Sequence, residues 1–145
     1  MSDAVYYEKP VLLHRDKHRN RKVLPSTSFA FAGKANSLYL AGVEFNEACK
    51  EYAIVFTRIA NQKIVPVAML GLRTRENLFV NKDEGWDGSY IPAFVRRYPF
   101  VLADLPGQPG MGVCIDEAFK GLGNSEGEAL FDEQGNNTPF LQNAL

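Results

Sequence analysis

Long hydrophobic runs are missing from the 145-residue chain. The richest stretch, residues 64–72, is much shorter than the roughly 18 apolar residues that a membrane-spanning helix needs, and Pro66 and Gly71 interrupt it. The N-terminal segment also lacks the apolar core of a signal peptide, because the run Val11-Leu12-Leu13 ends at His14. We therefore expect no membrane span and no cleaved secretion signal.

Cysteine is scarce. The chain has two cysteines, Cys49 and Cys114, which lie far apart and form no CxxC pair. Sparse cysteines without a pairing pattern are typical of proteins from a reducing compartment. We therefore expect a cytoplasmic protein with two reduced thiols in its core, with a single structural disulfide as the alternative. Signal-free secretion to the cell surface is the alternative location.

Neither sign of charge is in excess, because 16 Lys and Arg residues stand against 17 Asp and Glu residues, for a net charge of −1. No global field therefore favours nucleic acid or an anionic membrane as a partner. Locally, residues 14–22 carry +4 and residues 104–133 carry −6. The basic strip has no interleaved aromatic residues and matches no nucleic-acid-binding module, so we expect a solvated basic surface there. The basic and acidic segments could also pair with each other, either within the fold or with a partner.

Familiar catalytic motifs are missing too. The chain has no phosphate-binding lysine loop, no dinucleotide-binding glycine pattern and no HExxH sequence. Residues 123–127 match the GxSxG pattern of hydrolases, but no histidine follows them, so a glycine-rich turn is expected. His14, Asp16 and His18 lack a nearby third or fourth ligand for zinc. We predict no catalytic residue, no bound metal and no cofactor.

The chain does contain short amphipathic elements, in the mixture typical of an α+β domain. Apolar residues at helical spacing predict helices over 44–52 and 89–98, with Ser89 as the N-cap of the second helix and Pro92 in its first turn. Because Pro66 cannot donate a hydrogen bond, we expect the strand that contains it to be bulged or at a sheet edge. The predicted strands cover 37–43, 53–59, 63–70, 77–80, 100–103, 111–116 and 128–131.

Short turns at 60–62 and 105–110 join neighbouring strands, which favours antiparallel pairing. We therefore predict a single α+β domain over 1–145, built on a mainly antiparallel sheet of five to seven strands with two or three short helices packed on it. Thr138-Pro139 predicts the start of a last helix near the C-terminus. Two interpretations of this helix remain open: the natural chain continues beyond Leu145, or the helix docks on the sheet.

Several stretches together resemble one protein family. They are PVLL (10–13) with His18, VEF (43–45), EYAIVF (51–56), PVAMLGL (66–72), NLFV (77–80), YIPAFVRRYPF (90–100), CID (114–116), LFD (130–132) and TPFL (138–141). They resemble the bacterial SapC family, which is named after a protein linked to a surface layer, and YIPAFVRRYPF is the most specific block.

The resemblance covers nearly the whole chain and implies no catalytic residues. Members of the family usually continue through further helical sequence, which would agree with a longer natural chain. The family name implies a surface-layer role. The peptide-transporter permease label that some members carry conflicts with the absence of a membrane span in this sequence.

We predict a non-catalytic binding or assembly module that acts through a protein partner or a homo-oligomer, with the apolar face of the C-terminal helix in the contact. The alternative is a cytosolic enzyme or enzyme accessory for a small or peptidic substrate, and a small-molecule ligand is compatible with both. Trp86 is expected to be either a core anchor or an exposed binding platform. The candidate binding residues are His18, Trp86, Arg96, Arg97, Tyr98 and Asp116, and the enzyme alternative places a pocket near His18, Arg96, Arg97 and Asp116.

Overall fold

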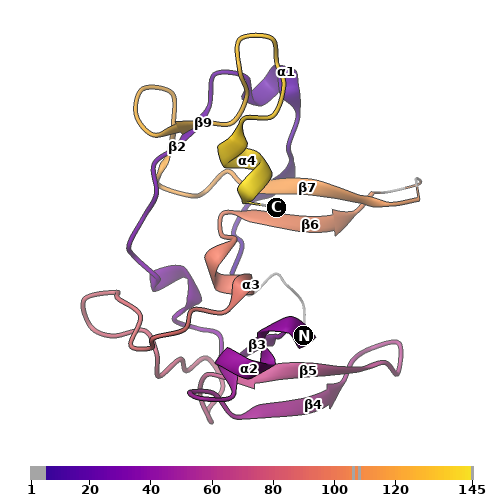
Figure 1. The fold of residues 1–145 in the computed structure, drawn as a ribbon, viewed down its shortest axis with the longest axis vertical. Coiled ribbons are helices and arrows are strands. Elements are labelled where there is room, and N and C mark those ends of the chain that lie inside the picture. Colours follow the sequence, from indigo (N-terminus) through magenta and orange to yellow (C-terminus); the bar gives the residue numbers. More distant parts are fainter. Residues whose placement is uncertain (1–5, 106, 108, 145) are drawn as a thin grey trace. The chain divides into compact units, whose positions relative to one another are not determined.

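The computed structural model describes residues 6–105, 107 and 109–144. Within these residues, nine strands form three antiparallel sheets of three strands each, accompanied by four short α-helices and two 3-10 helices. The predicted α+β class with antiparallel pairing is confirmed, although the strands are divided among three sheets and are not gathered into one. Figure 1 shows the order of the elements along the chain.

The described residues fall into two compact units. Unit 1 contains Tyr6 and residues 27–96, and unit 2 contains residues 7–26 and 97–144. Unit 1 is thus inserted into unit 2 along the chain. The expectation of a single domain over 1–145 stays a prediction.

Unit 1 is built on one sheet with the strand order β3-β5-β4. Its strands are β3 (Ser37–Tyr39), β4 (Ile54–Arg58) and β5 (Ile64–Met69), and its helices are η2 (Ala30–Ala32), η3 (Gly42–Glu44), α2 (Phe45–Ala48) and α3 (Ala93–Arg96). The β4–β5 hairpin agrees with the predicted strands 53–59 and 63–70 and with the turn predicted between them. The strand predicted over 77–80 is only an isolated bridge between Val80 and Trp86.

The expectation that Pro66 lies in an edge strand or at a bulge was wrong, because β5 is the central strand of this sheet and keeps a continuous register with β4. Hydrogen bonds from Ile59 to Lys63 and from Met69 to Ala53 set the alternation of the β4–β5 ladder. This alternation turns the backbone of Pro66 away from β4 and towards β3. The N–H that proline lacks would have faced Leu40, which lies just after the end of β3, so little of the hydrogen bonding between β3 and β5 is lost.

Both predicted helices of unit 1 are shorter than expected. The first consists of the 3-10 turn η3 and the single turn α2, and the second is only α3. Ser89 is not an N-cap. Its N–H donates to the Glu51 carboxylate at 2.9 Å, while the Glu44 carboxylate accepts from the N–H of Ala93 at 2.7 Å. Helix α3 begins only at Ala93, whose N–H is therefore one of those without a partner inside the helix, and Pro92 precedes the first helical turn.

Unit 2 contains the other two sheets. One has the order β1-β7-β6 and the other has the order β8-β2-β9. Their strands are β1 (Pro10–Leu12), β2 (Lys22–Val23), β6 (Phe100–Asp104), β7 (Met111–Asp116), β8 (Leu122–Gly123) and β9 (Glu128–Ala129), and the helices are α1 (Arg15–His18) and α4 (Pro139–Asn143). The β6–β7 hairpin is confirmed, and Pro106 and Gln108 of its predicted turn lie outside the described residues.

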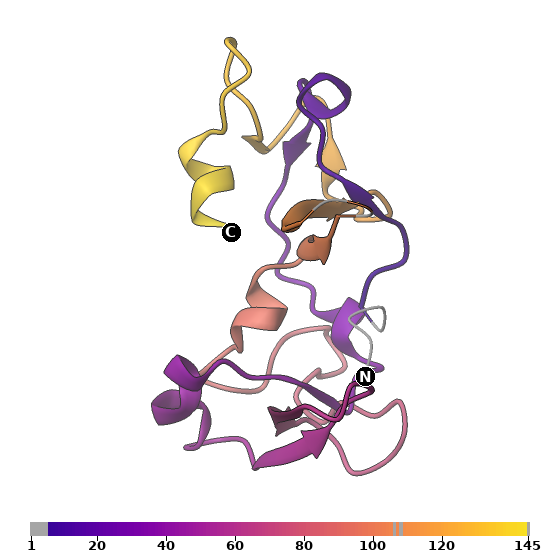
Figure 2. The same ribbon diagram turned by 90° about the vertical axis from the view of Figure 1, so that its right-hand side faces the viewer.

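The last helix packs on the core of its own unit. Thr138 caps α4, as predicted, because its Oγ1 accepts a hydrogen bond from the N–H of Leu141 at 3.3 Å. Leu141 is buried in the core, and the Phe140 ring meets the Phe100 ring edge-to-face. The ribbon of α4, at the yellow end of the chain, can be followed in Figure 2. The apolar face of α4 is therefore occupied within unit 2, contrary to the expectation that it forms part of a contact with a partner.

Candidate functional site

Asp116, at the end of β7, is fully buried and is surrounded by hydrogen-bond donors. Its carboxylate accepts the backbone N–H groups of Glu8 at 3.0 Å, Lys9 at 2.9 Å and Ala118 at 3.0 Å, and the Tyr98 hydroxyl at 3.4 Å. A buried carboxylate needs such partners to offset its loss of hydration. The bonds from Glu8 and Lys9 join the segment before β1 to the end of β7, so the carboxylate has a structural task.

Tyr98, another of the candidate binding residues, lies next to Asp116. Its ring also contacts Tyr7 and Phe119, with centroids 5.7 and 5.4 Å away. Burial, and then the negative charge of Asp116, raise the pKa of the Tyr98 hydroxyl far above its usual 10. The phenol therefore stays protonated and acts as a hydrogen-bond donor to the carboxylate.

Glu117 joins the basic N-terminal strip to the acidic C-terminal part of the chain. Its carboxylate lies 2.7 Å from Lys17 Nζ and 2.9 Å from Lys9 Nζ. Hydrogen bonds from Lys17 and then Lys9 outweigh partial burial and lower the pKa of Glu117 from 4.5 to about 2. At least part of the predicted pairing between the two charged segments therefore occurs within unit 2.

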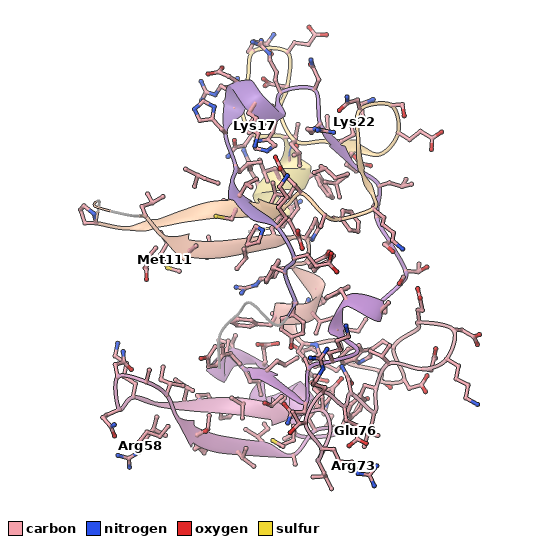
Figure 3. All side chains as sticks on the ribbon, turned by 180° about the vertical axis from the view of Figure 1, so that it is seen from behind. Lys17, Lys22, Arg58, Arg73, Glu76 and Met111 are labelled. Atoms are coloured by element: carbon pink, nitrogen blue, oxygen red, sulfur yellow. The ribbon has the colours of Figure 1, made fainter. Side chains whose placement is uncertain are left out.

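The rest of the basic strip makes similar local contacts. Arg19 donates to the backbone carbonyl of Glu133, and Lys22 Nζ donates to the backbone carbonyl of Ser125 at 3.3 Å. Lys17 and Lys22 can be followed in Figure 3. These side chains are therefore engaged in contacts within unit 2, whereas a nucleic-acid-binding surface would need to present such positive charges together.

His18 is the most deeply buried ionisable side chain of the strip, at 1% exposure. Its Nδ1 lies 3.0 Å from the backbone nitrogen of His14 and 3.1 Å from the carbonyl oxygen of the same residue, so the backbone of His14 can pair with Nδ1 whether or not Nδ1 carries a proton. Its Nε2 is buried, lies 3.6 Å from Glu117 Oε1 and has no closer hydrogen-bond partner among the described residues. His18 thus faces the Glu117 carboxylate inside unit 2.

The two predicted arginines belong to different units. Arg96 is exposed in unit 1, and its guanidinium lies over the Tyr90 ring at 5.6 Å from the centroid. Arg97 is half-buried in unit 2, where its carbonyl oxygen accepts the N–H of Phe100 at 2.7 Å. Within unit 2 the structure therefore groups His18, Tyr98 and Asp116 around the end of β7, and Arg96 and Trp86 belong to unit 1.

Trp86 is half-buried in an aromatic cluster of unit 1. Its ring stacks on Phe79 at 5.8 Å and meets Phe29 edge-to-face at 5.7 Å. Its Nε1–H donates to the Tyr52 hydroxyl at 2.9 Å, and that hydroxyl donates in turn to the carbonyl of Tyr90. Of the two interpretations of this tryptophan, these contacts agree with a core anchor.

The described part of the chain offers little for catalysis or metal binding. No group of three or more His, Cys, Asp and Glu side chains within it could hold a metal ion. Burial raises the pKa of the Cys114 thiol, which is opposite to the shift that a reactive thiolate requires. Gly127 of the GxSxG stretch has a φ of +103°, in keeping with the turn that joins β8 to β9. No helix among the described residues is both long and apolar enough to cross a membrane.

A different feature, which the sequence interpretation missed, is the outer edge of β4. This strand pairs with β5 on one side only, and no other strand of the described residues covers its second side. Phe56 is 66% exposed, and Val55 and Ile64 beside it are also exposed. Figure 3 shows Arg58 near the turn end of the hairpin, so the middle of β4 carries no charged residue.

The backbone of β4 presents its polar groups to this open side. The hydrogen bonds of Ile59 and Ala53 with β5 place the odd-numbered residues in hydrogen-bonded pairs. In an antiparallel ladder the intervening residues turn their N–H and C=O groups away from the partner strand. Ile54, Phe56 and Arg58 therefore direct three donors and three acceptors outwards.

The sequence contains part of the signal for this edge. The run Ile54-Val55-Phe56-Thr57 has neither proline nor a charged residue, and both are usual devices for protecting an edge strand. Which strand lies at the edge depends on the pairing of β3 with β5, which are joined through a long connection. The sequence therefore shows the uncharged residues of this strand, but it does not show that they lie at an exposed edge.

No curated protein and no solved structure matches this chain. The model of the SapC family matches residues 13–145, which is nearly the full length, and this agrees with the resemblance found in the sequence blocks. The chain belongs to the SapC family.

Proposed function

We propose that this SapC family member is a non-catalytic binding or assembly module, which acts through a protein partner or a second copy of itself. The observation that supports the proposal is the open edge of β4, where outward N–H and C=O groups lie beside the exposed ring of Phe56. Such an edge can bind an extended chain through main-chain hydrogen bonds, while the neighbouring side chains provide selectivity.

The polar residues of unit 2 support a binding role more than a catalytic one. The Asp116 carboxylate accepts four hydrogen bonds from its own unit, and Glu117 is held by two lysines. No observation favours the enzyme alternative, and we do not propose it.

The thiols bear on where such a module would work. The expectation that Cys49 and Cys114 both lie in the core was wrong, because Cys49 is exposed and Cys114 is half-buried. Both cysteines are free, and free thiols fit a reducing compartment. Our proposal therefore places the module in the cytoplasm. A surface-layer role would require further contacts besides β4, because one strand edge joins one partner strand and a layer extends in two directions.

Peptide selection on the intact chain tests the proposal. A displayed library of random peptides is enriched on the wild-type chain, and the enriched peptides are then titrated against Phe56→Lys and Leu72→Lys. Both substitutions exchange an exposed apolar side chain for a lysine, but Leu72 is 88% exposed in the bend after β5 and lies outside β4. We expect the peptides to bind Leu72→Lys like wild type and to lose most of their affinity for Phe56→Lys, because a charge in mid-strand opposes strand addition.

Self-association of the same three chains is followed by sedimentation over a wide concentration range, with circular dichroism to verify that each is folded. A lower association constant for Phe56→Lys alone would also support the proposal. If neither peptide binding nor self-association differs between Phe56→Lys and Leu72→Lys, the β4 edge is not the binding surface and the proposal fails.

A further inference from the structure

The backbone register of β4 indicates which chain could pair with its open edge. We infer that β4 pairs antiparallel with β4 of a second copy of this chain, about a two-fold axis at Phe56, an inference that rests on the proposed function of the edge. The pairing would extend the three-stranded sheet of unit 1 to six strands in the order β3-β5-β4-β4-β5-β3. Such a contact is isologous, because each copy uses the same surface.

The hydrogen-bonding groups select this register. With the axis at Phe56, Phe56 faces the partner's Phe56, and Ile54 faces the partner's Arg58. Each of the three outward residues then has an outward residue opposite it, so all three outward N–H and C=O groups of each β4 strand are satisfied. If the register shifts by two residues in one direction, Arg58 of each strand has no outward-facing β4 residue opposite it. A shift by two residues in the other direction leaves Ile54 of each strand in that position.

The charges agree with the same register. Arg58 is the only charged residue in β4, and in this register it faces the partner's Ile54. The two arginines are then four residues apart along the ladder, at about 14 Å. A shift of four residues would instead place Arg58 opposite the partner's Arg58 or opposite the partner's Lys50. Like charges that face each other directly destabilise a strand pair.

The side chains complement the backbone. Two exposed phenylalanine rings meet across the axis, and aromatic cross-strand pairs are among the favourable ones. Val55, also exposed, lies opposite the partner's Thr57 on the other face of the sheet. The edge of one strand is small for an interface, so we expect a weak, concentration-dependent dimer of the kind that interfaces below about 1,200 Å² form.

Disulfide trapping between copies tests the register. Cys49 and Cys114 are first replaced by Ser and Ala, and Val55→Cys and Thr57→Cys are then made as separate full-length chains. Each is oxidised mildly alone and as a mixture, and covalent dimers are quantified by mass. In the inferred register, Val55 faces the partner's Thr57 as a non-hydrogen-bonded pair with Cα atoms about 4.5 Å apart, which is within disulfide range.

We expect the mixed dimer to form several-fold faster than either self-linked dimer. A preference for the Val55→Cys self-dimer would move the axis to residue 55, and a preference for the Thr57→Cys self-dimer would move it to residue 57, and either result overturns the register. If no trapping exceeds that of a Leu72→Cys control, the second copy is not the occupant. If the selected peptides still lose affinity for Phe56→Lys in that case, the proposed function stands and only the inferred dimer is wrong. If no such peptides are found, both the proposed function and the inferred dimer are wrong.

Discussion

Phe56 of β4 and Pro66 of β5 face each other as a non-hydrogen-bonded pair. The polar groups of both residues point away from the shared ladder, so the missing N–H of Pro66 costs no hydrogen bond between β4 and β5. The same alternation turns the N–H and C=O of Phe56 to the open edge. One feature of the register therefore explains how a proline fits into a central strand and why β4 offers hydrogen bonds to a partner.

The substitution Asp116→Asn tests the structural task of Asp116. It removes a buried negative charge that four donors surround, and it places an amide donor among them. We expect a loss of about 3 kcal/mol in the free energy of unfolding, since hydrogen bonds to charged groups are strong and unsatisfied buried donors are costly. Urea unfolding followed by circular dichroism measures the loss.

Asp104→Asn is the matched control for Asp116, because Asp104 is the exposed last residue of β6 in the same unit. We expect it to change stability by less than about 0.5 kcal/mol. Equal effects of the two substitutions would show that the carboxylate of Asp116 does not hold the segment before β1.

The ion pairs of Glu117 should make the stability of unit 2 depend on pH. Hydrogen bonds from Lys17 and Lys9 lower the pKa of Glu117 from 4.5 to about 2. A lowered carboxyl pKa contributes stability that is complete above the unfolded value and is lost as pH falls through the folded value. We therefore expect Glu117→Gln to lower Tm near neutral pH, with a difference from wild type that shrinks between about pH 4.5 and about pH 2.

Added salt should reduce the same difference near neutral pH, because Lys9 and Lys17 are largely exposed and their charges are screened. Glu126→Gln, in the exposed turn between β8 and β9, serves as the control. A difference for Glu117→Gln that is constant with pH and salt would mean that the two lysines do not stabilise the fold through this carboxylate.

Unit 1 has its own reporter, because Trp86 is the single tryptophan of the chain. Tyr52→Phe removes the hydroxyl that accepts from Trp86 Nε1–H and donates to the Tyr90 carbonyl. We expect the free energy of unfolding of unit 1, followed by tryptophan emission in urea, to fall by about 1–2 kcal/mol, because a partly buried donor and a partly buried acceptor lose their partner.

The exposed neighbour Leu78 provides the comparison for this aromatic cluster. Leu78→Ala should leave the emission spectrum and the midpoint almost unchanged. If Tyr52→Phe has no larger effect than Leu78→Ala, Trp86 is not anchored by the hydroxyl, and its interpretation as a binding platform regains support.

Local patterns were sufficient for several elements. The β4–β5 and β6–β7 hairpins and the capped start of α4 follow from short-range alternation, turn residues and the Thr138-Pro139 signal. The helix predicted over 89–98 is shortened to α3, and the carboxylates of Glu51 and Glu44, which are distant in sequence, accept the N–H groups of Ser89 and Ala93. Strands of two residues, such as β2 and β8, are too short to show any period.

The sequence also named residues that lie together around Asp116 but did not reveal the structural task of this carboxylate. Tyr98 and His18 do gather near the end of β7, yet the hydrogen bonds of Asp116 are made to backbone groups, which leave no trace in a residue pattern. The exposure of Phe56 depends on strand order, which is set by contacts between distant segments. Single-chain patterns therefore identify the residues more readily than their surroundings.

Amide hydrogen exchange resolved by residue in β4 bears on the central proposal. At low protein concentration, we expect the N–H groups of Val55 and Thr57 to be protected by β5, and those of Ile54, Phe56 and Arg58 to exchange rapidly. At high concentration, or with a selected peptide, the second group should become protected in wild type and in Leu72→Lys but remain rapid in Phe56→Lys. Protection of Ile54, Phe56 and Arg58 that is the same under all these conditions would contradict a binding edge at β4.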